Sequence, residues 1–251
     1  MTKKLLRVEI VLVLAASLGT SAIYSLLRLA QLMLAPEGIG GSKTELNPSL
    51  ASAEFFTISF ELVGIAYSLA PAAIALYFLR RENDKTFSEV GIWPIKWRFD
   101  LTRGLGLAAA IGIPGLALYA VARLTNLASK IVPAELDGYW WMAGMLLLSA
   151  LRAALQEEVI MVAYLYTRLE QLGLSFRSQQ LVSASIRGLY HAYQGFAGII
   201  GNFVMGLVFG WAYRRWGRVL PLIVAHFILD AVSFVGYALL AKQLAIFGGL
   251  F

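Results

Sequence analysis

Cysteine is absent from the 251 residues of the chain, and charged residues and histidines are scarce. Without cysteine the protein has no disulfide, no thiolate nucleophile and no zinc site with cysteine ligands. Only 14% of the residues are charged and 59% are hydrophobic, far from the composition of a soluble domain. The charged residues collect between long apolar runs. The composition therefore predicts an integral membrane protein.

The excess of basic residues, a net charge of +6, lies mostly in the short segments between the apolar runs. Such a distribution is typical of the loops of a membrane protein rather than of a nucleic-acid-binding surface. We therefore expect membrane lipid as a partner and no nucleic acid.

Seven apolar segments predict an all-α, polytopic membrane protein that forms a single transmembrane domain over residues 1–251. The segments cover residues 8–34, 55–79, 104–122, 139–169, 180–193, 197–213 and 220–241. The fourth is longer than the ~20 residues that cross a bilayer, and the short fifth indicates a partial span packed against protein. A cleaved signal peptide is the alternative for the first, although its apolar stretch is long for one.

The distribution of Lys and Arg between the loops predicts the orientation of the chain. Basic residues are frequent before the first segment and after the second, fourth and sixth, and they are rare in the intervening loops. This alternation places the N-terminus in the cytoplasm and the C-terminus outside. The expected location is the bacterial cytoplasmic membrane.

Two adjacent carboxylates, Glu157 and Glu158, lie inside the fourth apolar segment. A carboxylate at membrane depth costs about 2.5–3.5 kcal/mol even on lenient insertion scales, so such residues generally mark functional sites. The two histidines of the chain, His191 and His226, lie in the fifth and seventh segments. Asp230 follows His226 by four residues, which places both on one helix face. We expect a site between the fourth, fifth and seventh helices.

These three clusters resemble, in order, the motifs of the CPBP family, the CAAX-protease and bacteriocin-processing intramembrane proteases also called the ABI family. The family's motifs are Glu-Glu-x-x-x-Arg, Phe-x-x-x-His and His-x-x-x-Asn or Asp. Glu157 and Glu158 match the first motif, His191 matches the second, and His226 with Asp230 matches the third. The resemblance covers about residues 140–235, the expected catalytic core, and points to the type II CAAX prenyl endopeptidases.

Two positions depart from the family pattern. Val162 stands where the first motif has arginine, and Arg187 stands where the second motif has phenylalanine. Arg187 lies one turn before His191 on the same helix face, from which it could neutralise Glu158. One interpretation is a cation lost at position 162 and regained at 187. The other is a drifted family member whose site no longer works.

The resemblance implies an intramembrane endopeptidase acting on a membrane-associated peptide or protein, with prenylated and bacteriocin-like substrates among the candidates. Glu157, assisted by His191, is expected to activate the attacking water, because carboxylates and imidazoles are common general bases. Glu158 would orient this pair or accept the counter-charge, with Arg187 in a supporting role.

The last motif is expected to stabilise the transition state. His226 would donate a hydrogen bond to the developing oxyanion, and Asp230 would orient His226. We favour no cofactor. Zinc stays an alternative, with Glu157, His191 and His226 as its ligands, although the stronger His-Glu-x-x-His signature is absent.

Two other functions would fit the same residues. A catalytically impaired family member would retain the scaffold as a bacteriocin-immunity or regulatory membrane partner. A proton-coupled transporter would also use intramembrane acids and histidines, but no inverted repeat is visible in the sequence.

Overall fold

The computed structural model describes residues 2–45, 54–83, 86–132 and 141–236, and these are almost entirely helical. The α-helices are α1 (Lys3–Ala15), α2 (Leu18–Leu34), α3 (Gly38–Gly41), α4 (Glu54–Glu82), α5 (Thr86–Glu89), α6 (Trp97–Leu124), α7 (Met142–Glu158), α8 (Leu165–Gln171), α9 (Phe176–Tyr190), α10 (Phe196–Trp216) and α11 (Leu220–Ala231). The π-helices are η1 (Val159–Tyr164) and η3 (Val232–Gly236), and η2 (Ala192–Gln194) is a 3₁₀ helix. The short strands β1 (Lys43–Glu45) and β2 (Lys130–Val132) pair in parallel. The predicted helical, membrane-type class is confirmed.

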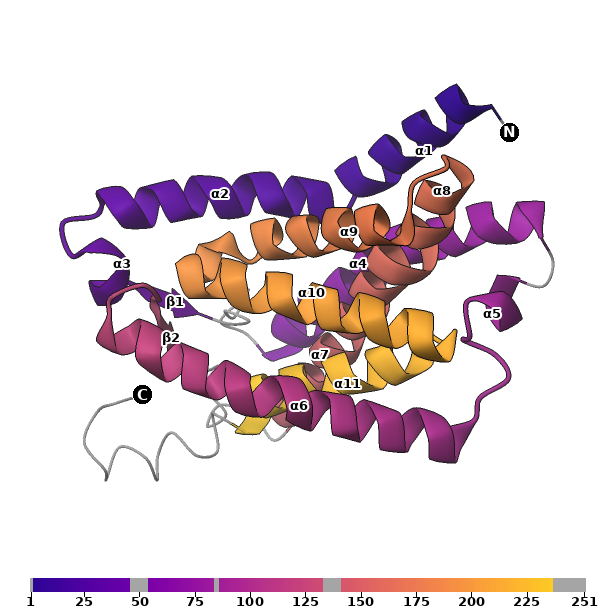
Figure 1. Ribbon diagram of the computed structural model, residues 1–251. Coiled ribbons are helices and arrows are strands. Elements are labelled where there is room, and N and C mark those ends of the chain that lie inside the picture. The colour runs from indigo at the N-terminus through magenta and orange to yellow at the C-terminus, as the bar shows by residue number, and fades with distance from the viewer. Residues whose placement is uncertain (1, 46–53, 84–85, 133–140, 237–251) are drawn as a thin grey trace.

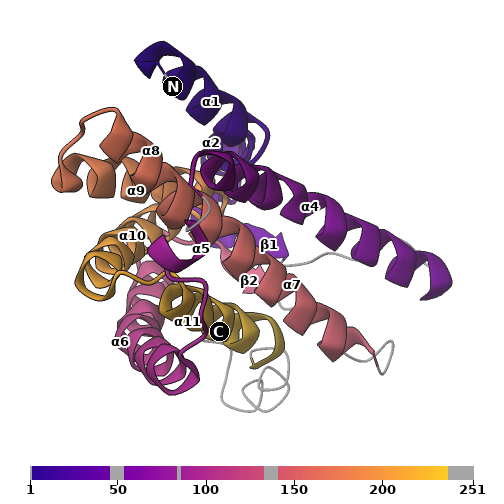
Figure 2. The ribbon, with the colours of Figure 1, turned by 90° about the vertical axis from the view of Figure 1, so that its right-hand side faces the viewer.

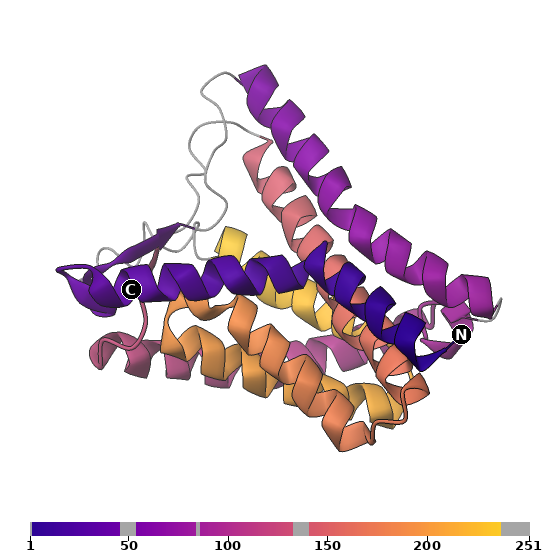
Figure 3. The ribbon, with the colours of Figure 1, turned by 90° about the horizontal axis from the view of Figure 1, so that it is seen from above.

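The helices that carry the three motifs each pack against two or more other helices. α9 packs against α2 and α10, while α11 packs against α6 and α7 (Figure 1). Figure 2 shows α11 between α6 and α7. From above, α4 and α7 run together at an angle to α2 (Figure 3), and these two helices also pack against each other. α11 therefore lies between α6 and α7, and α9 lies between α2 and α10.

Three of the described helices are long and apolar enough to cross a membrane, namely Ile58–Glu82 of α4, α6 and α10. The pair α1 and α2, bent by 52° at its break, would be a fourth if it is one span. The predicted count of seven spans is not confirmed in the described residues. The fourth predicted segment changes into η1 after Glu158, and α9 is only 15 residues long and carries Gln179 and Arg187. The seventh segment is described only as far as Gly236.

One end of the bundle carries most of the basic segments. The start of α1, the end of α4, the turn between α8 and α9, the start of α6 and the end of α10 all lie at this end (Figure 1). These are the segments in which Lys and Arg are frequent in the sequence. We call it the basic end, and by the positive-inside rule we expect it to face the cytoplasm.

A buried cluster of charges ties α1 and α4 to α8. Arg168 is fully buried, and its Nε donates to Glu9 Oε1 at 2.7 Å while its Nη1 donates to Glu82 Oε2 at 2.6 Å. The hydroxyl of Tyr164 donates to the same Glu9 oxygen at 2.9 Å. The sequence predicts Arg168 to be one of the basic loop residues that determine the orientation of the chain in the membrane. It instead neutralises two carboxylates, which offsets the cost of taking these charges out of water.

Replacing Arg168 tests how much this cluster contributes to the stability of the fold. Arg168→Leu leaves Glu9 buried without its cation, so we expect the free energy of unfolding to fall by about 3–5 kcal/mol. Thermal unfolding of the purified protein in detergent measures the change. Arg177→Leu is the matched control, because Arg177 is exposed on α9 and its loss should change stability by only about 0.5 kcal/mol. Equal melting temperatures for the two variants would contradict a structural role for Arg168.

Candidate active site

The first motif lies where α7 passes into the π-helix η1. α7 ends at Glu158 and η1 begins at Val159. π-Helical turns are rare and occur often at functional sites. The carbonyl oxygen of Met161 in η1 accepts a hydrogen bond from Ser183 Oγ of α9 at 2.8 Å. The wider turn after the two glutamates is therefore fastened to the helix that carries the second motif.

Glu158 is fully buried, and one of its oxygens faces two nitrogen groups. Arg187 Nη2 lies 2.8 Å from Oε1, and His226 Nδ1 lies 2.7 Å from the same atom. The other oxygen, Oε2, is buried and makes no hydrogen bond within the described residues. Because a buried carboxylate is stable only when its charge is compensated, this contact joins α7, α9 and α11 through a single side chain.

Glu157 faces the same arginine but is partly accessible. Its side chain is 12% exposed, and its Oε2 accepts a hydrogen bond from the hydroxyl of Tyr190 at 2.6 Å. Arg187 Nη1 lies 3.4 Å from that oxygen. In the described part of the chain both contacts fall on Oε2, so Oε1 is left for water or substrate. Arg187 thus contacts both glutamates of the first motif.

His191 stands at the C-terminal end of α9, with its ring orientation fixed by the helix itself. Its Nδ1 lies 3.0 Å from the carbonyl oxygen of Arg187. Since a carbonyl oxygen can only accept, Nδ1 carries the hydrogen, and Nε2 is the acceptor of the neutral ring. The ring packs on Tyr190 with 4.7 Å between centroids, and it interacts electrostatically with Glu157.

His226 links the buried and the accessible carboxylates. Its Nδ1 faces Glu158, while its Nε2 lies 3.5 Å from Asp230 Oδ2 and 3.9 Å from Glu157 Oε2. His226 is buried, whereas the side chain of Asp230 is 23% exposed. The predicted site residues therefore form two layers. Glu158, Arg187 and His226 make a buried layer, and Glu157, His191 and Asp230 make an accessible edge above it.

Residues 139–232 match a protein-family model described as type II CAAX prenyl endopeptidase Rce1-like. This segment belongs to the Rce1-like family. The resemblance drawn from the three motifs is thereby confirmed. No curated protein and no solved structure matches the chain. All five predicted catalytic residues, and Arg187, lie within the Rce1-like segment.

The two departures from the family motifs can be located within the Rce1-like segment. Val162, which replaces the usual arginine, is buried in η1 among apolar side chains. Arg187, which replaces the usual phenylalanine, makes the contact with Glu158 that the relocation interpretation requires. Its guanidinium also lies 5.4 Å from the ring centre of Phe209. Whether the relocated cation sustains activity stays a prediction.

The zinc alternative fits this arrangement poorly. Within the described residues, no group of three or more His, Asp or Glu side chains is placed so that it could hold a metal ion. His191 and His226 each have Nδ1 engaged by an oxygen atom, and His226 Nε2 is 3.9 Å from Glu157. These contacts leave Nε2 as the ring nitrogen available to a metal in each histidine, but in the described residues these atoms and Glu157 do not converge on one metal position.

Tyr190 belongs to the site although the motifs do not include it. It is buried, and its hydroxyl makes the shortest contact of Glu157. The available signal was its position three residues after Arg187, which puts both side chains on the same part of the α9 surface. An aromatic residue beside a histidine is too common for this spacing alone to assign a role.

Exchanging the two unusual residues tests the relocated cation. Arg187→Phe removes one partner of Glu158, so we expect the free energy of unfolding to fall by about 3–5 kcal/mol. Adding Val162→Arg returns a cation to the family position and should recover part of this loss, despite about 1–3 kcal/mol of strain from the larger side chain. Thermal unfolding in one detergent compares the variants.

The single variant Val162→Arg is the control for that strain, because it adds the larger side chain while Arg187 is still present. It should be less stable than the wild type. A double variant no more stable than Arg187→Phe alone would contradict the relocation and favour drift.

Proposed function

We propose that this protein is an intramembrane endopeptidase that hydrolyses a peptide bond of a membrane-associated peptide or protein. The Rce1-like segment supports a peptidase acting at a membrane. The observation that carries the proposal is the two-layered site. Glu157 and His191 are partly exposed, and they rest on a buried layer that holds them in place.

Glu157 and His191 are the groups that would activate water. Glu157 has one oxygen held by Tyr190 and Arg187 and the other left for a water molecule. His191 has Nδ1 held by a backbone carbonyl, so its Nε2 would position the same water. As the water oxygen attacks the carbonyl carbon of the substrate, its proton passes to Glu157.

His226 would stabilise the negative charge that develops on the carbonyl oxygen. Its Nδ1 is held by Glu158, and its Nε2 lies toward the accessible edge beside Asp230. A donor that is already oriented contributes more than one that must reorganise. When the C–N bond breaks, the proton on Glu157 passes to the departing nitrogen, which yields a carboxylic acid and an amine.

An apolar surface on α7 supports a substrate that lies in the membrane. Leu147, Leu148 and Leu151 are exposed between one and three turns before Glu157 on this helix. A prenyl group or another lipid chain would find an apolar surface there while its peptide reached the glutamates. The family's description as prenyl endopeptidases makes a prenylated CAAX peptide the substrate to test first.

Glu157→Gln and His191→Asn should each slow cleavage by about 10²–10⁴-fold, the usual contribution of general acid–base catalysis. The assay uses the full chain in liposomes with a farnesylated CAAX peptide and an unprenylated copy, and mass spectrometry identifies the products. Glu170→Gln, at an exposed carboxylate on α8, is the matched control and should cleave at the wild-type rate. Cleavage by both site variants at the wild-type rate would refute the proposed chemistry and favour the non-catalytic partner.

Metal removal separates the two mechanisms that the motifs left open. Because the ligand groups do not converge on one point, we expect dialysis against a strong chelator to leave the cleavage rate unchanged. The matched measurement is the metal content of the dialysed protein by mass spectrometry. Loss of activity that returns when zinc is added would overturn the metal-free mechanism while leaving the peptidase proposal intact.

A further inference from the structure

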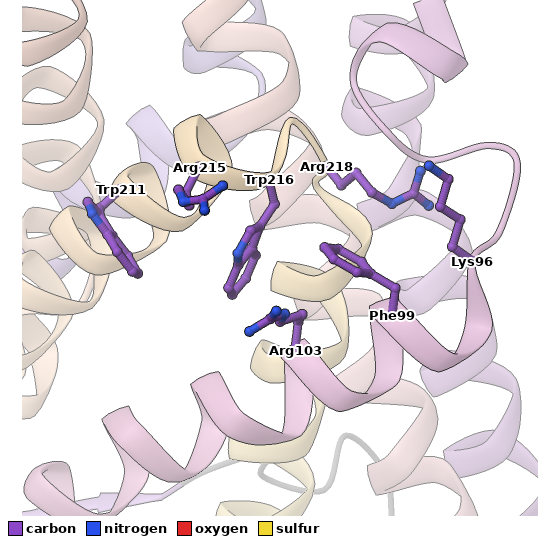
Figure 4. A pocket seen from close by; sticks show the side chains of 7 residues that line it. All are labelled: Lys96, Phe99, Arg103, Trp211, Arg215, Trp216 and Arg218. Atoms are coloured by element: carbon purple, nitrogen blue, oxygen red, sulfur yellow. The ribbon is translucent and has the colours of Figure 1, made fainter.

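A pocket at the basic end is formed by residues that the proposed chemistry does not use. It has a volume of about 460 Å³ and lies between the start of α6 and the end of α10. Its walls are formed by Lys96, Phe99, Arg103, Trp211, Arg215, Trp216 and Arg218. Figure 4 shows Phe99 and Arg103 of α6 facing Trp216 of α10 across this space. The pocket is separate from the glutamates and histidines of the active site.

The pocket is strongly basic. Four of its seven lining residues carry a positive charge, and none of the seven is acidic. Arg218 has its own counter-charge, because its Nε and Nη2 donate to the two oxygens of buried Asp100 at 2.7 and 2.8 Å. Lys96, Arg103 and Arg215 pair with no carboxylate in the part of the chain that the structure describes. Three uncompensated cations around one pocket favour an anionic ligand.

Aromatic rings hold one of these cations in place. The Arg103 guanidinium lies 5.6 Å from the centre of the Phe99 ring and 5.8 Å from that of Trp216. The two rings contact each other edge to face at 6.3 Å. Guanidinium–ring contacts of this kind orient an arginine without neutralising its charge. The same rings give the pocket an apolar wall beside its basic one.

The wall of the pocket is built from segments far apart in the sequence. Asp100 accepts the backbone N–H of Lys96 at 2.7 Å as well as the Arg218 guanidinium, and Arg218 Nη2 also donates to the carbonyl of Pro94. The start of α6 is therefore fastened to the linker between α10 and α11. Gly91, with φ at +71°, lies directly against the Arg218 backbone, which leaves no room for a Cβ atom at this position.

The position of the pocket suits a ligand that is itself part of the membrane. α6 and α10 are two of the helices that are long enough to cross a bilayer, and the pocket lies at their shared end. Trp97 and Trp211 are exposed there, as expected for residues at a membrane surface. Leu101 and Leu105 are exposed on the next turns of α6, where an acyl chain would run. A phosphate at headgroup depth would meet the unpaired cations.

We propose that this pocket binds the phosphate headgroup of an anionic membrane phospholipid. Lys96, Arg103 and Arg215 would contact the phosphate, and Trp211 and Trp216 would cover the junction of headgroup and acyl chains. A zwitterionic headgroup carries its own cation, which these side chains would repel, so phosphatidylglycerol binds more tightly than phosphatidylcholine.

The test measures lipid binding by the full-length protein in a neutral detergent. Native mass spectrometry gives the apparent dissociation constants for phosphatidylglycerol and phosphatidylcholine of equal chain length. The double variant Arg103→Gln with Arg215→Gln should weaken phosphatidylglycerol binding about thirtyfold, which corresponds to two basic side chains at about 1 kcal/mol each. Both arginines are exposed, so the variant should retain its fold, and circular dichroism checks this.

The matched control is the double variant Arg98→Gln with Arg214→Gln. It removes the same charge at the same end of α6 and α10, but Arg98 lies over Trp97 and Arg214 lies over Phe176, outside the pocket. It should weaken binding by less than about threefold, since solvent and salt screen exposed charges.

The proposal fails on any of three results. Equal losses in the two double variants would mean that general surface charge attracts the lipid. Equal affinity of the wild type for the two phospholipids would remove the role of the anionic headgroup. Competition by inorganic phosphate at the same concentration would identify a site for the free anion instead of a lipid.

Discussion

Neutralisation of the fully buried Glu158 is the constraint on which the site depends. A carboxylate in this position is tolerated only with a cation and hydrogen-bond donors around it, and the chain supplies Arg187 from α9 and His226 from α11. Arg187 does more than balance the charge. Its guanidinium also contacts Glu157, and its carbonyl oxygen fixes the ring of His191. One residue outside the usual family pattern thus positions both of the groups proposed to activate water.

The residues of the site differ in exposure, and this difference matches the proposed division between positioning and chemical roles. Glu158 and His226 are buried and engage each other, so they are already oriented before substrate arrives. Glu157 and Asp230 are partly exposed, as the proposed chemistry requires of groups that contact water and substrate. Hydrolysis inside a membrane would require both features. The buried charges must be compensated by partner groups, and the attacking water must still be able to reach the site.

The motifs predicted which residues come together, but hydropathy did not predict the number of spans. Each motif lies on one helix, and residues of different helices meet because each needs a polar partner in an apolar interior. The short fifth segment, predicted as a partial span packed against protein, forms the 15-residue α9 with Gln179 and Arg187 buried. The sequence pattern was misleading for Arg168. A basic residue after an apolar run is typical of a loop, and its carboxylate partners, Glu9 and Glu82, lie far away in the sequence.

The arginines of the molecule differ chiefly in whether the fold supplies their counter-charge. Arg168, Arg187 and Arg218 are buried and each pairs with a carboxylate from a distant segment, so their charges hold helices together. Arg103 and Arg215 line a pocket with no such carboxylate among the described residues, and the rings around Arg103 orient its charge without cancelling it. A cation that the protein positions but does not neutralise is suited to an anion from outside, which is the physical basis of the proposed lipid-headgroup site.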